Sequence, residues 1–379
     1  MQRALRAERI FDGWRIWHGH ALLLDGPGVI GIVKHVPKDV PVTDLGDGVL
    51  APGCVDLQVN GGGGEMVGAD TNVAQLARIC ATHRALGATS ILPTLITDTP
   101  EVTARVIDAA RHATAKGLPG FAGLHLEGPH LDPARHGAHD PALIRPMQDA
   151  DLVILEQAAK ELPALLVTVA PAAATAQQIA RLRAAGAVVS LGHADCTAEQ
   201  ARAAFAAGAR CVTHLFNAMS QLANRAPGLV GATLCSEVHA GIIADGIHVA
   251  ADPLLIALRM MAPDRLFLVS DAMAAAGSAA ESFPLNGRQV FRRDGRLTLA
   301  DGTLAGADIT LPQSVAHLIG LGVPIERALA MASRIPADVI GARHLGRFSA
   351  GAQADIVLLD HTGQLQQVWT AQEAAQLTA

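Results

Sequence analysis

The sequence predicts an α/β protein whose main domain is a (β/α)8 TIM barrel, because short apolar strands alternate with Ala- and Leu-rich helical stretches along most of the chain. The length of 379 residues suits such a barrel with a small added module. Hydrophobic residues make up 50% of the chain and charged residues 17%, which favours a folded interior over disorder. Eight strand candidates occur, near residues 52–59, 88–94, 121–127, 165–170, 187–192, 210–215, 241–246 and 266–271.

Helical patterns lie between several of these strands. NVAQLARICATHRALG, AQQIARLRAAG and AEQARAAFAAG each close on a glycine, which is the residue that a left-handed helix C-cap favours. A repeat of strand, helix, glycine and strand is what a parallel barrel requires.

The two ends of the chain differ from the middle. Residues 1–50 hold short alternating pieces separated by turns such as Asp12-Gly13, and ADIVLLD and LQQVWTA near the C-terminus are again strand-like. We expect residues 1–50 and 345–379 to pair into a small β-module that flanks a barrel domain of residues 51–344.

Composition excludes several classes of protein. The net charge is -6 and the arginines are scattered, so the chain has no basic stripe for nucleic acid. No signal-peptide pattern and no run of 18 apolar residues occurs, which predicts a cytoplasmic protein without a membrane partner. Five cysteines without a CxxC pair predict reduced, packed thiols.

Polar residues stand where five of the predicted strands end. In a parallel barrel the C-terminal strand ends meet over one mouth, where reactive side chains belong. These residues are Glu127, His193, His214, His248 and Asp271.

Three of the five residues suit a metal ion. Imidazole nitrogen and carboxylate oxygen are good ligands for Zn²⁺, and a catalytic zinc commonly takes three protein ligands and leaves one position for water. We expect Glu127, His193 and His214 to hold one divalent ion, with Fe²⁺, Co²⁺ and Mn²⁺ open besides Zn²⁺. The alternative is two buried histidines bonded to backbone and a glutamate in an internal ion pair; convergence of three strand ends favours the metal.

Asp271 is placed to carry a proton. A metal ion lowers the pKa of water to about 7, but amide hydrolysis also needs a group that protonates the leaving amine. A carboxylate across the mouth could take the proton from water and pass it to nitrogen. The alternative for Asp271 is a helix cap.

The motifs at these strand ends resemble those of a known family, the amidohydrolase superfamily, and within it the N-acetylglucosamine-6-phosphate deacetylases. The resemblance covers nearly the whole chain, with order and spacing in agreement. Its carriers are APGCVDLQVNGGGG at 51–64, GLHLEGPHLDPARHGAHDP at 123–141, LGHAD at 191–195, THLFNAM at 213–219, RAPGLVGA at 225–232, IIADGIHV at 242–249, LVSDA at 268–272 and GTLAGAD at 302–308.

The resemblance implies a barrel with a β-sandwich built from both termini, zinc or a similar ion on the three ligands, and Asp271 as general base and acid. Many amidohydrolases carry His-x-His in the first strand and hold a second metal there, whereas this chain has Gln58-Val59-Asn60. The chain therefore resembles the one-metal branch. Gln58 is expected to orient the metal-bound water or line the pocket, or else to satisfy backbone groups.

The resemblance also implies substrate contacts. His139, with Ala138 beside it, would meet the sugar and the acetyl carbonyl as an oxyanion donor, while His130 and His136 of the same loop are expected to be solvated. The phosphate would be held by Asn217, Ala218, Arg225 and His248. A loop over the pocket would bring Leu304, Ala305 and Gly306 to the acetyl methyl or the sugar ring.

Arg225 would reach the active site of a neighbouring subunit, which implies a homodimer; the alternative is an exposed loop arginine. The expected function is a metal-dependent deacetylase that converts N-acetyl-D-glucosamine 6-phosphate to D-glucosamine 6-phosphate and acetate. Alternatives are the galactosamine epimer or another N-acyl amino-sugar phosphate as substrate, and a non-catalytic barrel that binds the sugar phosphate.

Overall fold

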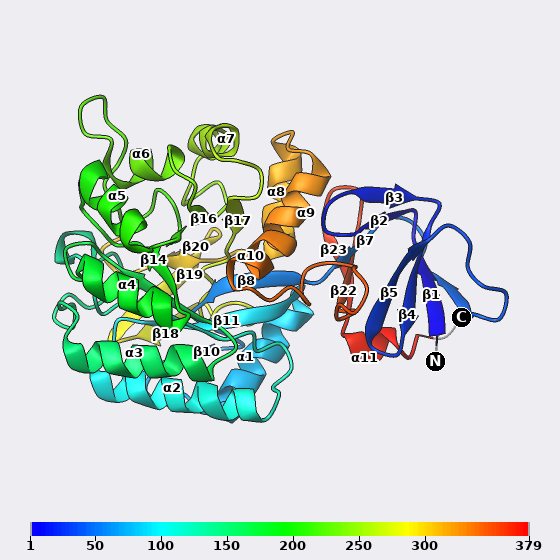
Figure 1. The fold of residues 1–379 in the computed structure, drawn as a ribbon, viewed down its shortest axis with the longest axis horizontal. Helices are drawn as coiled ribbons and strands as arrows, with labels where there is room; N and C mark the ends of the chain where they lie inside the picture. Colours follow the sequence, from blue (N-terminus) through cyan, green and yellow to red (C-terminus); the bar gives the residue numbers. More distant parts are fainter. Residues whose placement is uncertain (1, 378–379) are drawn as a thin grey trace.

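The computed structural model describes residues 2–377, which form a large barrel and a smaller β-unit beside it (Figure 1). The barrel sheet has eight strands, each parallel to its hydrogen-bonded neighbours. All eight predicted strands are confirmed. They are β8 (Cys54–Val59), β11 (Ala88–Ile96), β12 (Leu124–Glu127), β13 (Leu165–Val169), β14 (Val188–Leu191), β15 (Cys211–Val212), β16 (His239–Ile242) and β17 (Leu266–Leu268).

A buried carboxylate helps to close the barrel between its first and last strands. Both oxygens of Asp56 on β8 accept from the Ser270 backbone N–H at 3.2 Å, and the Asn60 N–H donates to the Ala272 carbonyl at 2.8 Å. Burial raises the pKa of Asp56 to about 7. The closure therefore uses a side chain where β17 is too short to pair.

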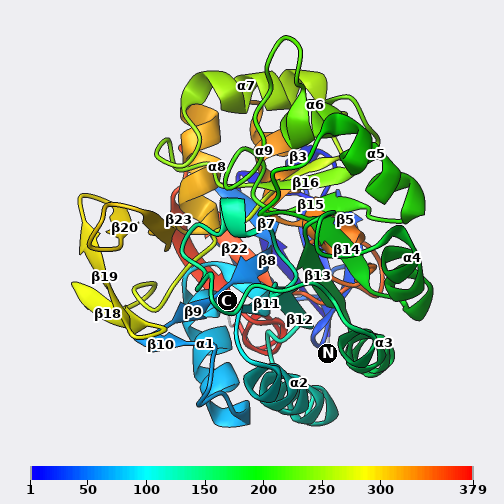
Figure 2. The same cartoon turned by 90° about the vertical axis from the view of Figure 1, so that its left-hand side faces the viewer.

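Ten helices of the described chain cover or follow the barrel strands (Figure 2). Two of the predicted helices, α4 and α5, begin at capping boxes and end at glycines with positive φ, as expected. The ten are α1 (Val73–Ala85), α2 (Pro100–Ala115), α3 (Asp149–Glu161), α4 (Ala176–Ala185), α5 (Ala198–Ala207), α6 (Gly228–Leu234), α7 (Ala251–Met260), α8 (Leu311–Gly320), α9 (Ile325–Ala332) and α10 (Arg334–Val339).

The smaller unit is built from both ends of the chain, as expected. One sheet contains β5 (Gly28–Val33), β4 (Ala21–Asp25), β1 (Gln2–Arg6) and β6 (Val42–Asp44). The other contains β23 (Leu365–Trp369), β22 (Ile356–Leu359), β7 (Val49–Pro52), β2 (Arg9–Phe11) and β3 (Ile16–His18). A short helix, α11 (Ala371–Ala374), follows them.

The two ends meet in that second sheet, where β22 pairs antiparallel with β7. A separate apolar cluster that includes Leu22, Leu50 and Ile356 packs the unit. The division into residues 1–50 with 345–379 and residues 51–344 stays a prediction; Met1, Thr378 and Ala379 lie outside the described residues.

An antiparallel sheet between β17 and α8 was not predicted. Its strands are β18 (Ser282–Leu285), β19 (Arg288–Arg293), β20 (Arg296–Thr298) and β21 (Leu304–Ala307), and it stands at the side of the barrel mouth (Figure 2). The strands are short, and β19 and β20 are arginine-rich, so their sequences resemble those of solvated loops. Asn286-Gly287 and Asp294-Gly295, both with positive φ, were the available hairpin signals. The expected loop at Leu304–Gly306 is therefore a strand.

Smaller elements are β9 (Gly61–Gly62) with β10 (Glu65–Met66), and one 3₁₀ turn, Pro133–Arg135. All five cysteines are free, and four are buried; Cys235 is exposed, so it is not the packed thiol that was expected. Within residues 2–377, no helix is long and apolar enough to cross a membrane.

Candidate active site

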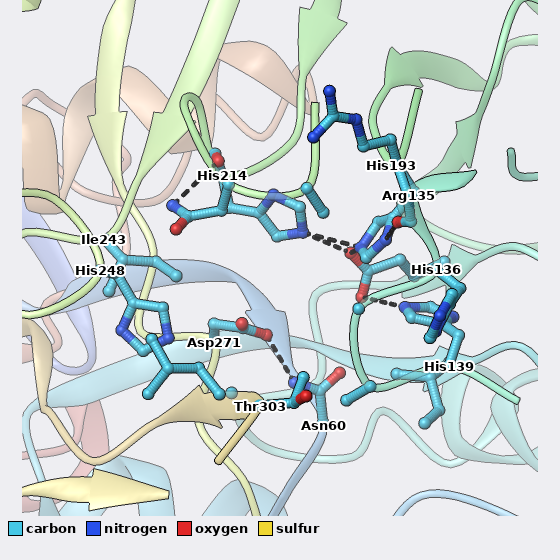
Figure 3. A pocket seen from close by; sticks show the side chains of 18 of the residues that line it. Asn60, Arg135, His136, His139, His193, His214, Ile243, His248, Asp271 and Thr303 are labelled. Carbon is cyan, nitrogen blue, oxygen red and sulfur yellow. Dashed lines mark hydrogen bonds and ion pairs between the residues drawn. The ribbon is translucent and has the colours of Figure 1, made fainter. Parts of the chain in front are cut away.

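A cavity of about 450 Å³ opens at the C-terminal ends of the barrel strands, where the predicted polar residues gather (Figure 3). Glu127, His193 and His214 are buried there, Asp271 is half-buried, and His248 lies at the same cavity. Its lining residues are Asn60, Ile96, Glu127, Ala134, Arg135, His136, Gly137, Ala138, His139, His193, His214, Asn217, Ala218, Ile243, His248, Asp271, Met273, Leu285, Thr303, Leu304 and Gly306.

Glu127, His193 and His214 converge on one point. Glu127 Oε1 lies 2.9 Å from His214 Nε2 and 3.3 Å from His193 Nε2, and the two Nε2 atoms are 3.1 Å apart. All three side chains are at most 5% exposed. The structure thus brings together the three residues that the sequence marked as a set.

The protonation of His193 suits a metal ligand. Its Nδ1 lies 2.8 Å from the Arg135 carbonyl, which can only accept, so Nδ1 carries a proton, and in the neutral ring the lone pair on Nε2 then faces the cluster. His214 Nδ1 is buried without a hydrogen-bond partner among the described residues. The buried Glu/His cluster is consistent with a metal site, because its oxygen and nitrogen atoms can replace their mutual contacts by contacts with one cation.

His139 stands beside this cluster with the opposite tautomer. Ligand atoms of Glu127, His139 and His193 also lie within 4.8 Å of one another. However, His139 Nδ1 accepts the Thr97 backbone N–H at 3.2 Å, so a neutral ring carries its proton on Nε2. Burial lowers the pKa of His139 well below its usual range and keeps the ring neutral. His139 is therefore a hydrogen-bond donor toward the cavity, not a third imidazole ligand.

Asp271 is fixed by two amides of the first barrel strand. Its Oδ1 accepts from Gln58 Nε2 at 3.1 Å. The same oxygen accepts from Asn60 Nδ2 at 2.7 Å (Figure 3). Gln58 Nε2 also donates to Glu127 Oε1 at 3.1 Å. With Oδ1 occupied by donors, Oδ2 is the oxygen free to take a proton.

The two carboxyls have displaced pKa values of opposite sign. Burial alone would raise the pKa of Glu127, but the hydrogen bonds and charges of His193 and His214 hold it well below its ordinary value. Burial, followed by the negative charge of Glu127, raises the pKa of Asp271 to about 6. An ionised ligand and a proton-exchanging group are the roles that such a separation supports.

The backbone is strained where it delivers these residues. His193, His214 and Asp271 have φ values of 47°, 32° and 51°, in the left-handed region that non-glycine residues avoid. Each follows its strand by two or three residues, so the chain turns inward at the strand end. Strain of this kind, about 1–3 kcal/mol each, is held in place by surrounding packing and gathers at functional sites.

The other predicted residues divide into three groups. Those that line the cavity are Ala138, His139, Asn217, Ala218, His248, Leu304 and Gly306. Gln58 and Ala305 are buried behind the wall and do not line it. Arg225 is exposed in the loop before α6, outside the cavity, so this chain does not bring it to its own site.

Two loop histidines differ from expectation. His130 is 2% exposed and its ring lies against the Arg145 carbonyl, so it is not solvated. His136 lines the cavity, and its buried Nδ1 has no partner among the described residues. The proline and charged residues around these histidines favoured a solvated loop. No sequence pattern shows that the loop folds back over the mouth of the barrel.

Asn60, Thr97 and Leu285 are site residues that the sequence did not single out. Asn60 was recognised only as a poor metal ligand, although it directly follows β8 and its place two residues after Gln58 puts both amides on the same side of the extended chain. Thr97 and Leu285 carry no chemical signal of their own. Only the fold shows that they reach His139 and the cavity.

Comparisons with known proteins agree with this architecture. The model of the amidohydrolase family matches residues 49–376. An N-acetylgalactosamine-6-phosphate deacetylase of Shewanella sp. (strain ANA-3) is 40% identical over 88% of this chain and 85% of its own.

Solved structures agree over the full length. The N-acetylglucosamine-6-phosphate deacetylase of Pasteurella multocida has a TM-score of 0.94 at 34% identity, covering 98% of this chain and 99% of its own. A mutant N-acetyl-D-glucosamine-6-phosphate deacetylase of Mycobacterium smegmatis in complex with N-acetyl-D-glucosamine-6-phosphate has a TM-score of 0.91 at 32% identity, covering 98% of both chains. The expectation drawn from the motifs is confirmed, and this chain belongs to the amidohydrolase family.

Proposed function

We propose that this protein hydrolyses the amide of an N-acetyl amino-sugar 6-phosphate and releases acetate. The observation that carries the proposal is one cavity holding a Glu/His cluster, a carboxyl with a pKa raised to about 6 and a neutral histidine donor. Amide hydrolysis needs these three functions together: activation of water, transfer of a proton and stabilisation of an oxyanion.

Glu127, His193 and His214 are the proposed ligands of one divalent ion, with Zn²⁺ the first candidate. When bound, the ion supplies a Lewis acid that activates water and polarises the acyl oxygen. A second ion has no matching ligands at the end of β8, because the side chains of Gln58 and Asn60 are neutral amides, which bind transition metals more weakly than imidazole does.

Asp271 is the proposed proton carrier. Its Oδ2 accepts a proton as water attacks the acyl carbon, and the same oxygen returns the proton to the sugar nitrogen as the C–N bond breaks. Gln58 and Asn60 keep Oδ1 in place, so rotation of the carboxyl does not carry the proton away from the nitrogen.

His139 is the proposed oxyanion donor, through Nε2–H. The acyl group would then lie against the apolar part of the wall next to His139, formed by Ile96, Ala138, Met273 and Leu285. Asn286 Nδ2 donates to the Thr97 carbonyl at 3.5 Å, and Arg288 donates to the Ala138 carbonyl. These bonds fix Leu285 beside the residues that orient His139.

The phosphate would lie at the other end of the cavity, near Asn217, Ala218 and His248. The lining guanidinium, Arg135, is already paired with Asp195 at 2.7 Å. A dianion needs a further cation, and the proposal is that Arg225 of a second copy supplies it in a homodimer.

The substrate epimer has two candidates. N-acetyl-D-glucosamine 6-phosphate is favoured by the full-length structural likeness to enzymes named for it, one of them in complex with this sugar. N-acetyl-D-galactosamine 6-phosphate is favoured by the Shewanella relative at 40% identity. Only the C4 configuration separates the two.

The test is acetate release by the purified, Zn²⁺-loaded protein from both epimers in competition. We expect turnover of both, with the preferred epimer identified by its larger kcat/KM. Tight binding of either sugar phosphate without acetate release would contradict the proposal and indicate a non-catalytic binding barrel.

A further inference from the structure

A chain of buried polar side chains crosses the barrel interior directly below the Glu/His cluster. His125 Nε2 lies 2.8 Å from Thr168 Oγ1, Thr168 Oγ1 lies 2.7 Å from Thr213 Oγ1, and Thr213 Oγ1 lies 2.7 Å from Ser190 Oγ. All four residues are at most 5% exposed. Barrel interiors are usually filled by Val, Ile and Leu. A layer of polar side chains inside this barrel is therefore unusual and indicates a specific role.

One backbone group sets the direction of every hydrogen bond in this chain. His125 Nδ1 lies 3.1 Å from the Leu57 carbonyl, which can only accept, so Nδ1–H donates. Nε2 of the neutral ring must then accept from the Thr168 hydroxyl. Each hydroxyl has a single hydrogen, so Thr213 donates to Thr168 and Ser190 donates to Thr213. The layer has one internally consistent arrangement.

Three of the four members of the layer lie on, or directly after, the strands that lead to the cluster residues. His125 is two residues before Glu127 on β12, Ser190 is on β14 three residues before His193, and Thr213 directly precedes His214. β13 contributes nothing to the cluster. Its Thr168 is in register with both Glu127 and Ser190, and it links β12 to the other two strands.

The backbone before His193 rests on the same layer. A Cβ at Gly192 would lie 2.8 Å from Thr168 Cγ2 and 3.0 Å from Thr213 Cβ, so this backbone packs directly against both threonines. The backbone directly before His193 therefore contacts Thr168 and Thr213, and Thr213 is itself the residue before His214.

We propose that the hydroxyl of Thr168 is a positioning group for the metal site: it joins His125, Thr213 and Ser190 into one rigid layer that fixes the spacing of Glu127, His193 and His214. The inference rests on the proposed metal site. Groups behind metal ligands typically change metal affinity by about 10–100-fold when they are removed. The Thr168 hydroxyl bonds His125 and Thr213 and none of the three cluster side chains, and Thr168 does not line the cavity, so it would act only through the strands that it links.

The experiment compares Thr168→Val, which keeps the shape and removes the hydroxyl, with Thr168→Ser, which keeps the hydroxyl. The matched control is Thr233→Val, because Thr233 is equally buried and its hydroxyl bonds only the Leu229 carbonyl within α6. The readouts are the dissociation constant for Zn²⁺, by competition with a chelator on the full chain, and kcat and KM at saturating Zn²⁺.

We expect Thr168→Val to bind Zn²⁺ at least about tenfold more weakly and to lose kcat with KM little changed. Thr168→Ser and Thr233→Val should stay near the parent protein. Equal Zn²⁺ affinity in Thr168→Val and the parent, or equal losses in Thr168→Val and Thr168→Ser, would overturn the proposal. A parent protein that binds no Zn²⁺ would instead refute the proposed function.

A second measurement needs no variant at position 168 to fold. ¹⁵N NMR of histidine-labelled parent protein, with His125 assigned by its loss in His125→Gln, should show a proton on Nδ1 and none on Nε2. A proton on His125 Nε2 would mean that Nε2 cannot accept from the Thr168 hydroxyl. The donor and acceptor order of the polar layer would then be wrong, which would contradict the proposal.

Discussion

Glu127 and Asp271 face one cavity from two different strands, and their surroundings differ in kind. Glu127 lies among imidazoles whose Nε2 atoms are within 3.3 Å of its Oε1. Asp271 lies among neutral amides that donate to one of its oxygens. Loss of hydration would by itself raise the pKa of both carboxyls, and their neighbours decide that only Asp271 keeps a raised pKa.

The difference shows how one barrel mouth can hold a fixed anion and an exchangeable proton side by side. Imidazole neighbours can give up their contacts to a shared cation, whereas amide neighbours cannot. We call Glu127 with its imidazole neighbours the metal half of the mouth, and Asp271 with its amide neighbours the proton half. Mutations should therefore be able to change one half without changing the other.

The largest effect on the proton half should come from Asp271→Asn. The amide keeps the shape but cannot take a proton, so kcat should fall about 10²–10⁴-fold, the usual contribution of general acid–base catalysis. Bound Zn²⁺ should remain at the parent level. Loss of Zn²⁺ together with activity would mean that Asp271 belongs to the metal half.

Asn60→Ala should reduce kcat by about tenfold, because it removes a hydrogen bond of about 1.5–3 kcal/mol to a charged group that orients Asp271. Steady-state kinetics with Gln75→Ala as the control would measure this, since the Gln75 amide is also buried but donates to the Met66 carbonyl and not to Asp271. An unchanged kcat in Asn60→Ala would show that Gln58 alone holds the carboxyl.

The dependence of kcat/KM on pH tests the same difference between Glu127 and Asp271. Asp271 must be ionised to accept a proton, so kcat/KM should decline as pH falls through about 6, the raised pKa of this group. The Asn60 hydrogen bond favours the ionised form and lowers that pKa, so Asn60→Ala should move the decline to higher pH. A decline that moves to lower pH in Asn60→Ala would contradict this assignment.

The smallest effect concerns the acyl wall. Leu285→Ala should raise the ratio of kcat/KM for N-propionyl over N-acetyl substrate by about tenfold, since one methylene in an apolar pocket is worth about 1–3 kcal/mol. Leu297→Ala is the control, because Leu297 is buried in the same apolar cluster without lining the cavity. The same ratio in both variants would show that the gain comes from loosened packing.

The sequence was sufficient for the barrel and the strand-end residues, because strand and helix periods and polar interruptions are local signals. It identified Glu127, His193, His214 and Asp271, and the structure brings these four to one cavity. It did not predict the β18–β21 sheet, whose strands look like polar loop.

The residues that hold His139 and Asp271 in place could not be predicted, because their contacts join distant parts of the chain. Thr97 meets His139 across 42 residues, and Asn60 meets Asp271 across 211. Such pairs leave no periodic trace in a single chain. The sequence also showed no sign that Arg225 is exposed. In the proposed homodimer, its partner would be the active site of a second copy of this chain.

The central claim is that one ion is held by Glu127, His193 and His214 while Asp271 acts without binding it. Zinc content per chain, measured on the parent protein, Glu127→Gln and Asp271→Asn after identical Zn²⁺ loading and desalting, tests it most directly. We expect one ion in the parent and in Asp271→Asn and almost none in Glu127→Gln. Two ions in the parent, or full zinc in Glu127→Gln, would contradict it.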